Sequence, residues 1–185
     1  MATVAKGARR PKSSFRGKLD LFYEADFSFA RSRRSELHTL REVSLRQTHS
    51  RLREDMHALQ QVAYGIALLE QTTETETPIP TLYALFKSLL AEVSRAACEP
   101  RTVLAFEAKL LVELGQQPDT VEAKLSPGSR QIYARLETDD WPALALLKLS
   151  SGQATELRQF LHGYLIYHLG KIPKGRGEAV QSGSV

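Results

Sequence analysis

The chain has 185 residues, of which 42% are hydrophobic and 25% are charged. This composition can bury a core and excludes a chain that is disordered throughout, and the length allows a small domain joined to a larger one. No apolar run approaches the length of a membrane span, and the first residues lack the apolar stretch of a secretory signal. We therefore expect a cytoplasmic protein with no membrane partner. The single cysteine, Cys98, excludes an internal disulfide and fits a reducing compartment.

Charge divides the chain into two parts. Residues 1–53 hold 13 Lys or Arg against 5 Asp or Glu, a net charge of +8, whereas the remainder has a net charge of −4. A basic head on an acidic body is expected of a nucleic-acid-binding module attached to a domain with another task. We predict a nucleic-acid-binding domain over residues 1–47, a helical domain over residues 48–173 and a flexible tail over residues 174–185.

The segment from residue 6 to residue 18, called the basic loop here, contains no acid. Gly and Pro residues interrupt it, so we expect turns between extended segments and no helix. A run of positive charge is often only a solvated surface, but this punctuation and the aromatic-rich segment that follows favour the binding of an anionic partner. The candidate phosphate-binding residues of the loop are Lys6, Arg9, Arg10, Lys12, Arg16 and Lys18.

Alternating apolar and polar residues predict a strand over residues 19–30, with Tyr23, Phe27 and Phe29 on its buried face. A basic groove beside an aromatic surface is the combination with which OB-folds bind single strands. Phe15 is our candidate for stacking on a base, although packing in a core is the commoner role of such a ring.

A second basic turn, residues 31–35, separates this strand from another predicted strand over residues 36–45. We call it the arginine turn, because it contains Arg31, Arg33 and Arg34. These side chains fit phosphate binding and, equally, ion pairs with acids of the helical part.

From residue 51 onward, apolar residues recur every three or four positions, which predicts helices. Three apolar stripes, within residues 52–69, 82–93 and 103–114, indicate antiparallel helices that form a bundle, the third closed by Gly115. Ser126 and Pro127 predict the start of a further helix. We expect two more helices over residues 141–149 and 155–169.

No pattern of catalytic residues is evident, so we expect a protein that is not an enzyme and has no catalytic residue. His162 and His168 are six residues apart and fall on different faces of one helix, which disfavours a shared metal ion. Glu99 beside Cys98 should raise the pKa of the thiol, which favours a packed cysteine over a nucleophile. The acidic pairs at residues 54–55 and 139–140 are typical of helix starts.

Three segments of the basic part are distinctive: Lys-Gly-Ala-Arg-Arg-Pro-Lys-Ser at residues 6–13, Phe-Arg-Gly at residues 15–17 and Glu-Leu-His-Thr-Leu-Arg-Glu at residues 36–42. They resemble the RecO family of bacterial DNA repair proteins. Residues 51–55, 106–111 and 164–170 are similar to the same family in the same order, so the resemblance covers most of the chain.

The resemblance implies an α+β fold. Members of the family begin with an OB-fold, a five-stranded barrel, and only residues 1–5 precede the basic loop here, so we expect an incomplete OB-fold-like barrel followed by an all-α domain. Many members also carry a zinc module of four cysteines after the third helix. Residues 115–126 contain no Cys or His, and we therefore predict no zinc site and no cofactor.

The resemblance further implies a recombination mediator that is associated with the nucleoid. Such a protein would bind single-stranded DNA, with duplex DNA as a further ligand, and would anneal complementary strands. It would contact the tail of single-strand-binding protein and work with a RecR-type partner to load recombinase onto DNA coated by single-strand-binding protein. The composition fits a basic-armed structural protein of ribosomal or transfer RNA nearly as well. A nuclease is disfavoured because no carboxylate cluster is evident.

Overall fold

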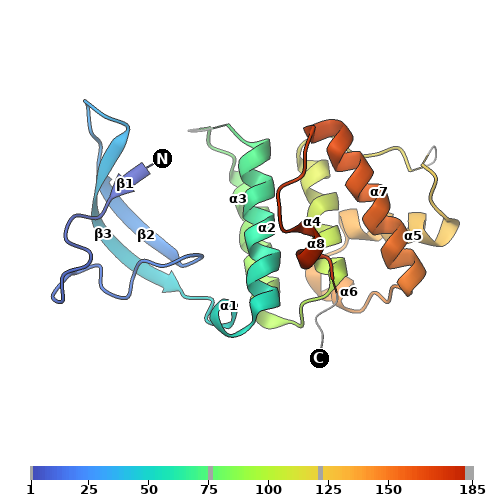
Figure 1. The fold of residues 1–185 in the computed structure, drawn as a ribbon, viewed down its shortest axis with the longest axis horizontal. Coiled ribbons are helices and arrows are strands. Elements are labelled where there is room, and N and C mark those ends of the chain that lie inside the picture. The colour runs from blue at the N-terminus through green and yellow to red at the C-terminus, as the bar shows by residue number, and fades with distance from the viewer. Residues whose placement is uncertain (1, 75–76, 121–122, 182–185) are drawn as a thin grey trace. The chain divides into compact units, whose positions relative to one another are not determined.

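The computed structural model describes residues 2–74, 77–120 and 123–181. The chain forms two compact units, Met1–Ser50 and Arg51–Val185. The first contains a small β-sheet and the second is helical (Figure 1). The predicted α+β class, a small β region followed by an all-α region, is therefore confirmed. None of the helices within the described residues is both long and apolar enough to cross a membrane.

The first unit is an open three-stranded sheet. Its strands are β1 (Ala2–Val4), β2 (Glu24–Ala30) and β3 (Leu37–Gln47), in the order β1-β3-β2. β1 runs parallel to β3 and β2 runs antiparallel to it. The sheet's core is formed by Phe15, Leu40 and Val43. This arrangement is consistent with an incomplete OB-like barrel.

The first predicted strand begins later than expected. Residues 19–23 are not part of a strand. A turn lies at residues 21–22, where Phe22 has the left-handed φ of 59°, and β2 starts only at Glu24. Phe27 was assigned to the core, but 58% of its surface is exposed. The assignment was wrong because the Phe15 cluster packs against Ala25 but leaves Phe27 at the edge of an open hollow. Tyr23 and Phe29 are partly buried.

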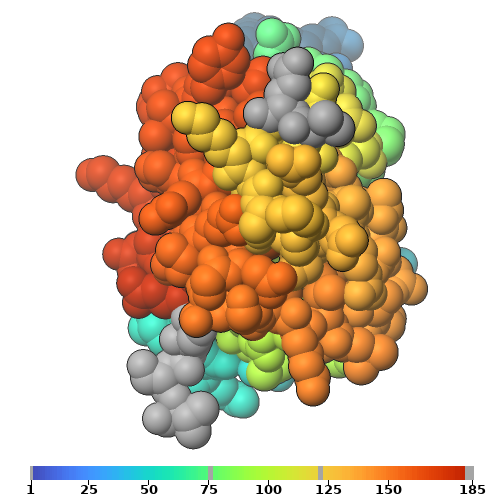
Figure 2. All heavy atoms as spheres, turned by 90° about the vertical axis from the view of Figure 1, so that its right-hand side faces the viewer, coloured from blue at the N-terminus to red at the C-terminus, as the bar shows by residue number. Residues whose placement is uncertain are grey.

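The second unit is organised around α4, which packs against helices from both earlier and later in the chain. Most α4 residues are buried. Figure 2 shows one face of this unit, where α5 and α7 lie side by side. The helices are α1 (Arg51–Glu54), α2 (Met56–Thr72), α3 (Pro80–Arg95), α4 (Pro100–Glu113), α5 (Pro127–Thr138), α6 (Trp141–Ala145), α7 (Ser151–Leu169) and α8 (Arg176–Ala179).

Capping residues set several of the helix boundaries. Ser126 caps α5 as predicted, and Gly115 follows α4 with a left-handed φ of 65°. α6 ends at Ala145, before the predicted end at residue 149. α7 begins at Ser151, earlier than predicted, because Ser150 and Gln153 form a reciprocal capping box.

A buried ion pair joins α8 to α4. Arg176 donates to both carboxylate oxygens of Glu107, at 2.6 and 2.8 Å, and the Tyr64 hydroxyl of α2 donates to the same carboxylate at 2.6 Å. Glu107 is fully buried and Arg176 is 6% exposed. Residues 176–181 therefore do not form the flexible tail that was predicted from residue 174, and residues 182–185 lie outside the described residues.

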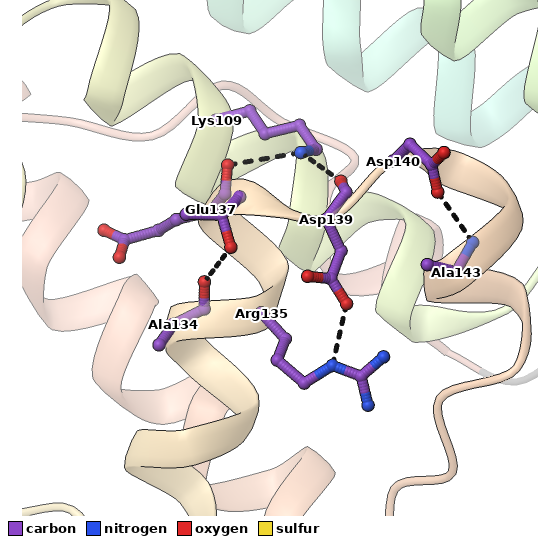
Figure 3. Close-up of polar contacts among 8 residues, drawn as sticks. Lys109, Ala134, Arg135, Glu137, Asp139, Asp140 and Ala143 are labelled. Carbon is purple, nitrogen blue, oxygen red and sulfur yellow. Dashed lines mark hydrogen bonds and ion pairs between the residues drawn. The ribbon is translucent and has the colours of Figure 1, made fainter.

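Lys109, two residues after Glu107 on α4, holds the end of α5 (Figure 3). Its Nζ donates to the backbone carbonyls of Glu137 and Asp139, at 3.2 and 2.6 Å. These carbonyls lack partners within their own helix, and a cation is favourable there. Burial lowers the pKa of Lys109. Next to it, Asp139 pairs with Arg135 at 2.7 Å, and Asp140 accepts a backbone N–H of α6.

The buried pair makes a stability prediction. Arg176→Met should lower the free energy of unfolding by about 3–5 kcal/mol, because the buried Glu107 carboxylate loses its counter-charge. Urea unfolding followed by the fluorescence of Trp141 measures this. Arg135→Met, which breaks a more exposed ion pair, is the control and should cost at most about 1 kcal/mol. The double variant Glu107→Gln/Arg176→Met should recover part of the loss, and equal losses in the single and double variants would contradict the pairing.

Glu137 makes a prediction about pH. Burial raises the pKa of its carboxyl group, so the folded chain holds this proton more tightly than the unfolded chain does. The resulting contribution to stability is present at acid pH and is lost as the pH rises through the raised pKa. Glu137→Gln should therefore make the chain more stable than the wild type at pH 7, with a difference that shrinks on acidification. Urea titrations between pH 4 and pH 7 test this, with Glu113→Gln as the matched exposed control. A variant that is less stable at pH 7 would contradict it.

Candidate nucleic-acid interface

The basic loop is a series of consecutive turns. Backbone N–H groups donate to the carbonyl three residues earlier at Arg10, Ser13, Arg16 and Lys18, with distances of 3.0 to 3.2 Å. Gly7 has a φ of 77° and Gly17 a φ of 70°, a left-handed conformation that favours glycine. The two glycines and these hydrogen bonds give the loop a defined path.

All six cations of the basic loop are exposed. Within the described sheet unit, none of them forms an ion pair with an acid. Arg16 makes a local contact, because its guanidinium donates to the Pro11 carbonyl at 3.3 Å. The loop thus presents unneutralised positive charge to solvent, which is the electrostatic requirement for binding phosphates.

Phe15 fixes the loop to the sheet. Its ring is 8% exposed and belongs to the cluster with Leu40 and Val43, and its N–H donates to Ser13 Oγ at 3.2 Å. The candidate role of Phe15 in base stacking is therefore not supported by this structure, because the ring is buried in the core of the sheet unit. Its burial keeps the neighbouring cations on the surface.

A mostly apolar hollow of about 190 Å³ lies beside the loop on the same unit. Lys18 of the basic loop lines it together with Tyr23, Phe27, Leu40 and Val43. Phe27 is the exposed aromatic residue of this surface, and sequence reasoning missed it because strand alternation placed the ring inside.

The arginine turn is a second exposed basic segment. Arg31, Arg33 and Arg34 are all exposed and form no ion pair with the described acids of the sheet unit. An ion pair elsewhere on this sheet joins Arg46 to Asp26. The structure brings the arginine turn and the basic loop into one small unit, but it places them at different connections between strands.

The remaining candidate groups are Cys98 and the possible metal ligands. Burial, and then the negative charge of Asp55, raise the pKa of the Cys98 thiol to about 11. The predicted direction is thus confirmed, but the neighbouring acid is Asp55 and not Glu99. The described residues contain no group of three or more His, Cys, Asp or Glu side chains that could hold a metal ion. Part of the segment where we predicted no zinc module, residues 121–122, lies outside the described residues.

Comparison with known proteins connects these features to DNA repair. Residues 53–123 match the family described as "Recombination protein O C terminal". A DNA repair protein RecO from Syntrophomonas wolfei is 29% identical over 118 residues, which are 64% of this chain and 46% of that protein. RecO from Alkaliphilus metalliredigens is 33% identical over 116 residues, covering 62% of this chain and 46% of the relative. RecO from Desulforamulus reducens is 26% identical over 202 aligned residues, covering 91% of this chain and 78% of the relative.

The chain thus combines a small basic sheet unit with a helical unit that matches a family of recombination proteins. This combination places it in the class of DNA repair and recombination proteins. Residues 53–123 carry the C-terminal region of the RecO family, and RecO proteins are similar to the chain over as much as 91% of its length. Its alignments span about half the length of the first two relatives, with 46% of each covered. The resemblance seen in the sequence is confirmed.

The burial of Phe15 makes a testable prediction. Phe15→Ala should destabilise the sheet unit by about 3–5 kcal/mol, because it removes the aromatic ring from the buried cluster that Phe15 forms with Leu40 and Val43. Amide hydrogen exchange of β3 and of the basic loop should accelerate. Phe27→Ala, which truncates an exposed ring on the same unit, is the matched control and should leave this exchange nearly unchanged. If Phe15→Ala retained full protection of β3, the ring would not be the anchor of the loop.

Proposed function

We propose that this protein binds single-stranded DNA through the basic loop and the arginine turn, and that it serves as a mediator of DNA repair and recombination. The observation that carries the proposal is the exposed, unneutralised charge of the basic loop on a defined backbone. The match of residues 53–123 to the RecO family, and the similarity to DNA repair proteins named RecO, support a role in repair. Duplex DNA is a further ligand of the same surface, since its phosphates carry the same charge.

The proposed mechanism is electrostatic and needs no covalent step, so the protein acts without being an enzyme. The cations neutralise phosphates and release counterions, which lowers the repulsion between two strands held on the same protein. This promotes the annealing of complementary strands. Contacts to phosphates carry no sequence information, so binding is expected to be independent of base sequence.

The proposed partners dock on the helical unit. A RecR-type protein and the tail of single-strand-binding protein would connect the chain to recombinase loading. A groove of about 310 Å³ between α7 and α8 is a candidate for the tail. Arg158 and Val180 both line it, which gives the groove a positive charge and an apolar wall suited to a peptide that ends in a carboxylate.

The alternative is a structural RNA-binding protein, which would prefer folded RNA to single-stranded DNA. A protein with the function proposed here should instead keep a labelled single-stranded DNA in the presence of an equal concentration of folded transfer RNA. Displacement of the DNA by transfer RNA at stoichiometric concentration would favour the alternative.

The salt dependence of DNA binding tests the proposal directly. In the variant Arg9→Ala/Arg10→Ala/Lys12→Ala/Arg16→Ala, the slope of log affinity against log salt should flatten by roughly 3, because each phosphate contact on a single strand contributes about 0.7. Fluorescence anisotropy with a labelled oligonucleotide, between about 50 and 300 mM salt, measures the slope, because the Debye length falls by about 2.4-fold over this range.

The control removes the same charge from the helical unit through Lys124→Ala/Lys148→Ala/Lys171→Ala/Lys174→Ala, all exposed positions. This variant should retain most of the wild-type slope. Equal flattening in both variants would mean that net charge alone drives binding, and an unmodified chain that does not bind single-stranded DNA would refute the proposed function.

A further inference from the structure

The arginine turn is held at its base by one side chain of β3. The backbone N–H of Ser32 donates to Nδ1 of His38 at 3.2 Å. The Ser32 hydroxyl in turn accepts the backbone N–H of Arg34, also at 3.2 Å. Ser32 therefore connects His38 to the segment that carries the three arginines.

The His38 ring is itself fixed in place. It is 4% exposed and stacks on Phe29 of β2, with ring centroids 5.6 Å apart and planes 12° from parallel. Phe29 and His38 lie on the two strands that the arginine turn connects. The stack thus sets the position of Nδ1 relative to both ends of the turn.

Burying the polar ring of His38 costs free energy that an apolar ring at this position would not cost. Because Ser32 donates to Nδ1, the proton of the neutral ring is assigned to Nε2. Nε2 is buried and has no hydrogen-bond partner among the described residues. A buried polar atom without a partner is unfavourable, and a phenylalanine would stack on Phe29 without it. A phenylalanine, however, could not accept the hydrogen bond from Ser32, and this acceptor is what His38 adds.

We infer that His38 is a positioning residue of the nucleic-acid interface, which holds the arginine turn in the conformation that contacts phosphate. This inference rests on the proposed function. The ring is too buried to touch a nucleic acid, so it acts through Ser32 and the backbone. Holding the backbone of the turn before binding reduces the conformational entropy that Arg31, Arg33 and Arg34 lose when they engage an anion.

Two substitutions separate the hydrogen bond from the stack. His38→Phe keeps an aromatic ring against Phe29 and removes the acceptor. His38→Asn removes the ring and keeps an acceptor, because Asn Oδ1 is as many bonds from the backbone as His Nδ1. Arg31→Ala/Arg33→Ala/Arg34→Ala in one chain gives the effect of losing the whole turn.

The measurements are the affinity of the full chain for a single-stranded oligonucleotide and the hydrogen exchange of the Ser32 amide. His38→Phe should weaken binding by about twofold to tenfold, the range of one net hydrogen bond, and should accelerate the exchange of Ser32. His38→Asn should stay within about twofold of the wild type in affinity and should protect Ser32. The triple arginine variant should weaken binding at least as much as His38→Phe.

Failure of the inference and failure of the proposed function give different results. If the arginine variant weakens binding but His38→Phe does not, or if both His38 variants weaken it equally, the positioning role is overturned while DNA binding stands. If the wild-type chain does not bind the oligonucleotide, the proposed function and the DNA role of His38 fall together. The exchange of Ser32 then still shows whether His38 holds the turn.

Discussion

The burial of one aromatic ring holds the candidate interface together. The basic loop brings six cations into thirteen residues, and like charges this close repel one another, which favours an extended and mobile chain. Phe15 opposes this tendency, because its ring inserts among Leu40 and Val43 and ties the centre of the loop to the sheet. The consecutive turns on either side of Phe15 then keep the charged side chains at the surface.

The helical unit solves the reverse problem, a charge in the interior. Glu107 is fully buried on the central helix and would be very unfavourable alone. Arg176 from the last helix and Tyr64 from α2 satisfy both of its oxygens. Residues 106–111, one of the segments that resemble the family, thus have separate tasks: Phe106, Leu110 and Leu111 fill the core, Glu107 receives α8, and Lys109 holds the end of α5.

What could be predicted from the sequence depended on local rules. The start of α5 at Ser126 and Pro127, the glycine that follows α4, and the change from a two-residue to a helical period all require only neighbouring residues, and they were predicted correctly. The exposure of Phe27 and the docking of Arg176 could not be predicted in this way. The exposure of Phe27 depends on which other segments cover that face of the sheet. The docking of Arg176 depends on the Glu107 carboxylate, 69 residues away.

The same limit applies to the candidate site. Composition identified the cations of the basic loop and the arginine turn, because charge runs are visible in any sequence. It could not show that Phe15 is an internal anchor, since a phenylalanine between Ser14 and Arg16 has the same neighbours whether it is buried or stacked on a base. It also gave no reason to select His38, whose role depends on a hydrogen bond across a turn and a stack between two strands.

In both the basic loop and the arginine turn, the backbone is fixed while the charged side chains are free, and this combination suits the proposed function. A mediator must hold DNA without regard to sequence and must release it to another protein. Long lysine and arginine side chains in solvent make contacts that are individually weak and sensitive to salt. A backbone fixed by Phe15 on one segment and by His38 on the other lets many such contacts form together at a small entropic cost. Affinity then comes from the number of contacts, while each contact remains easy to exchange.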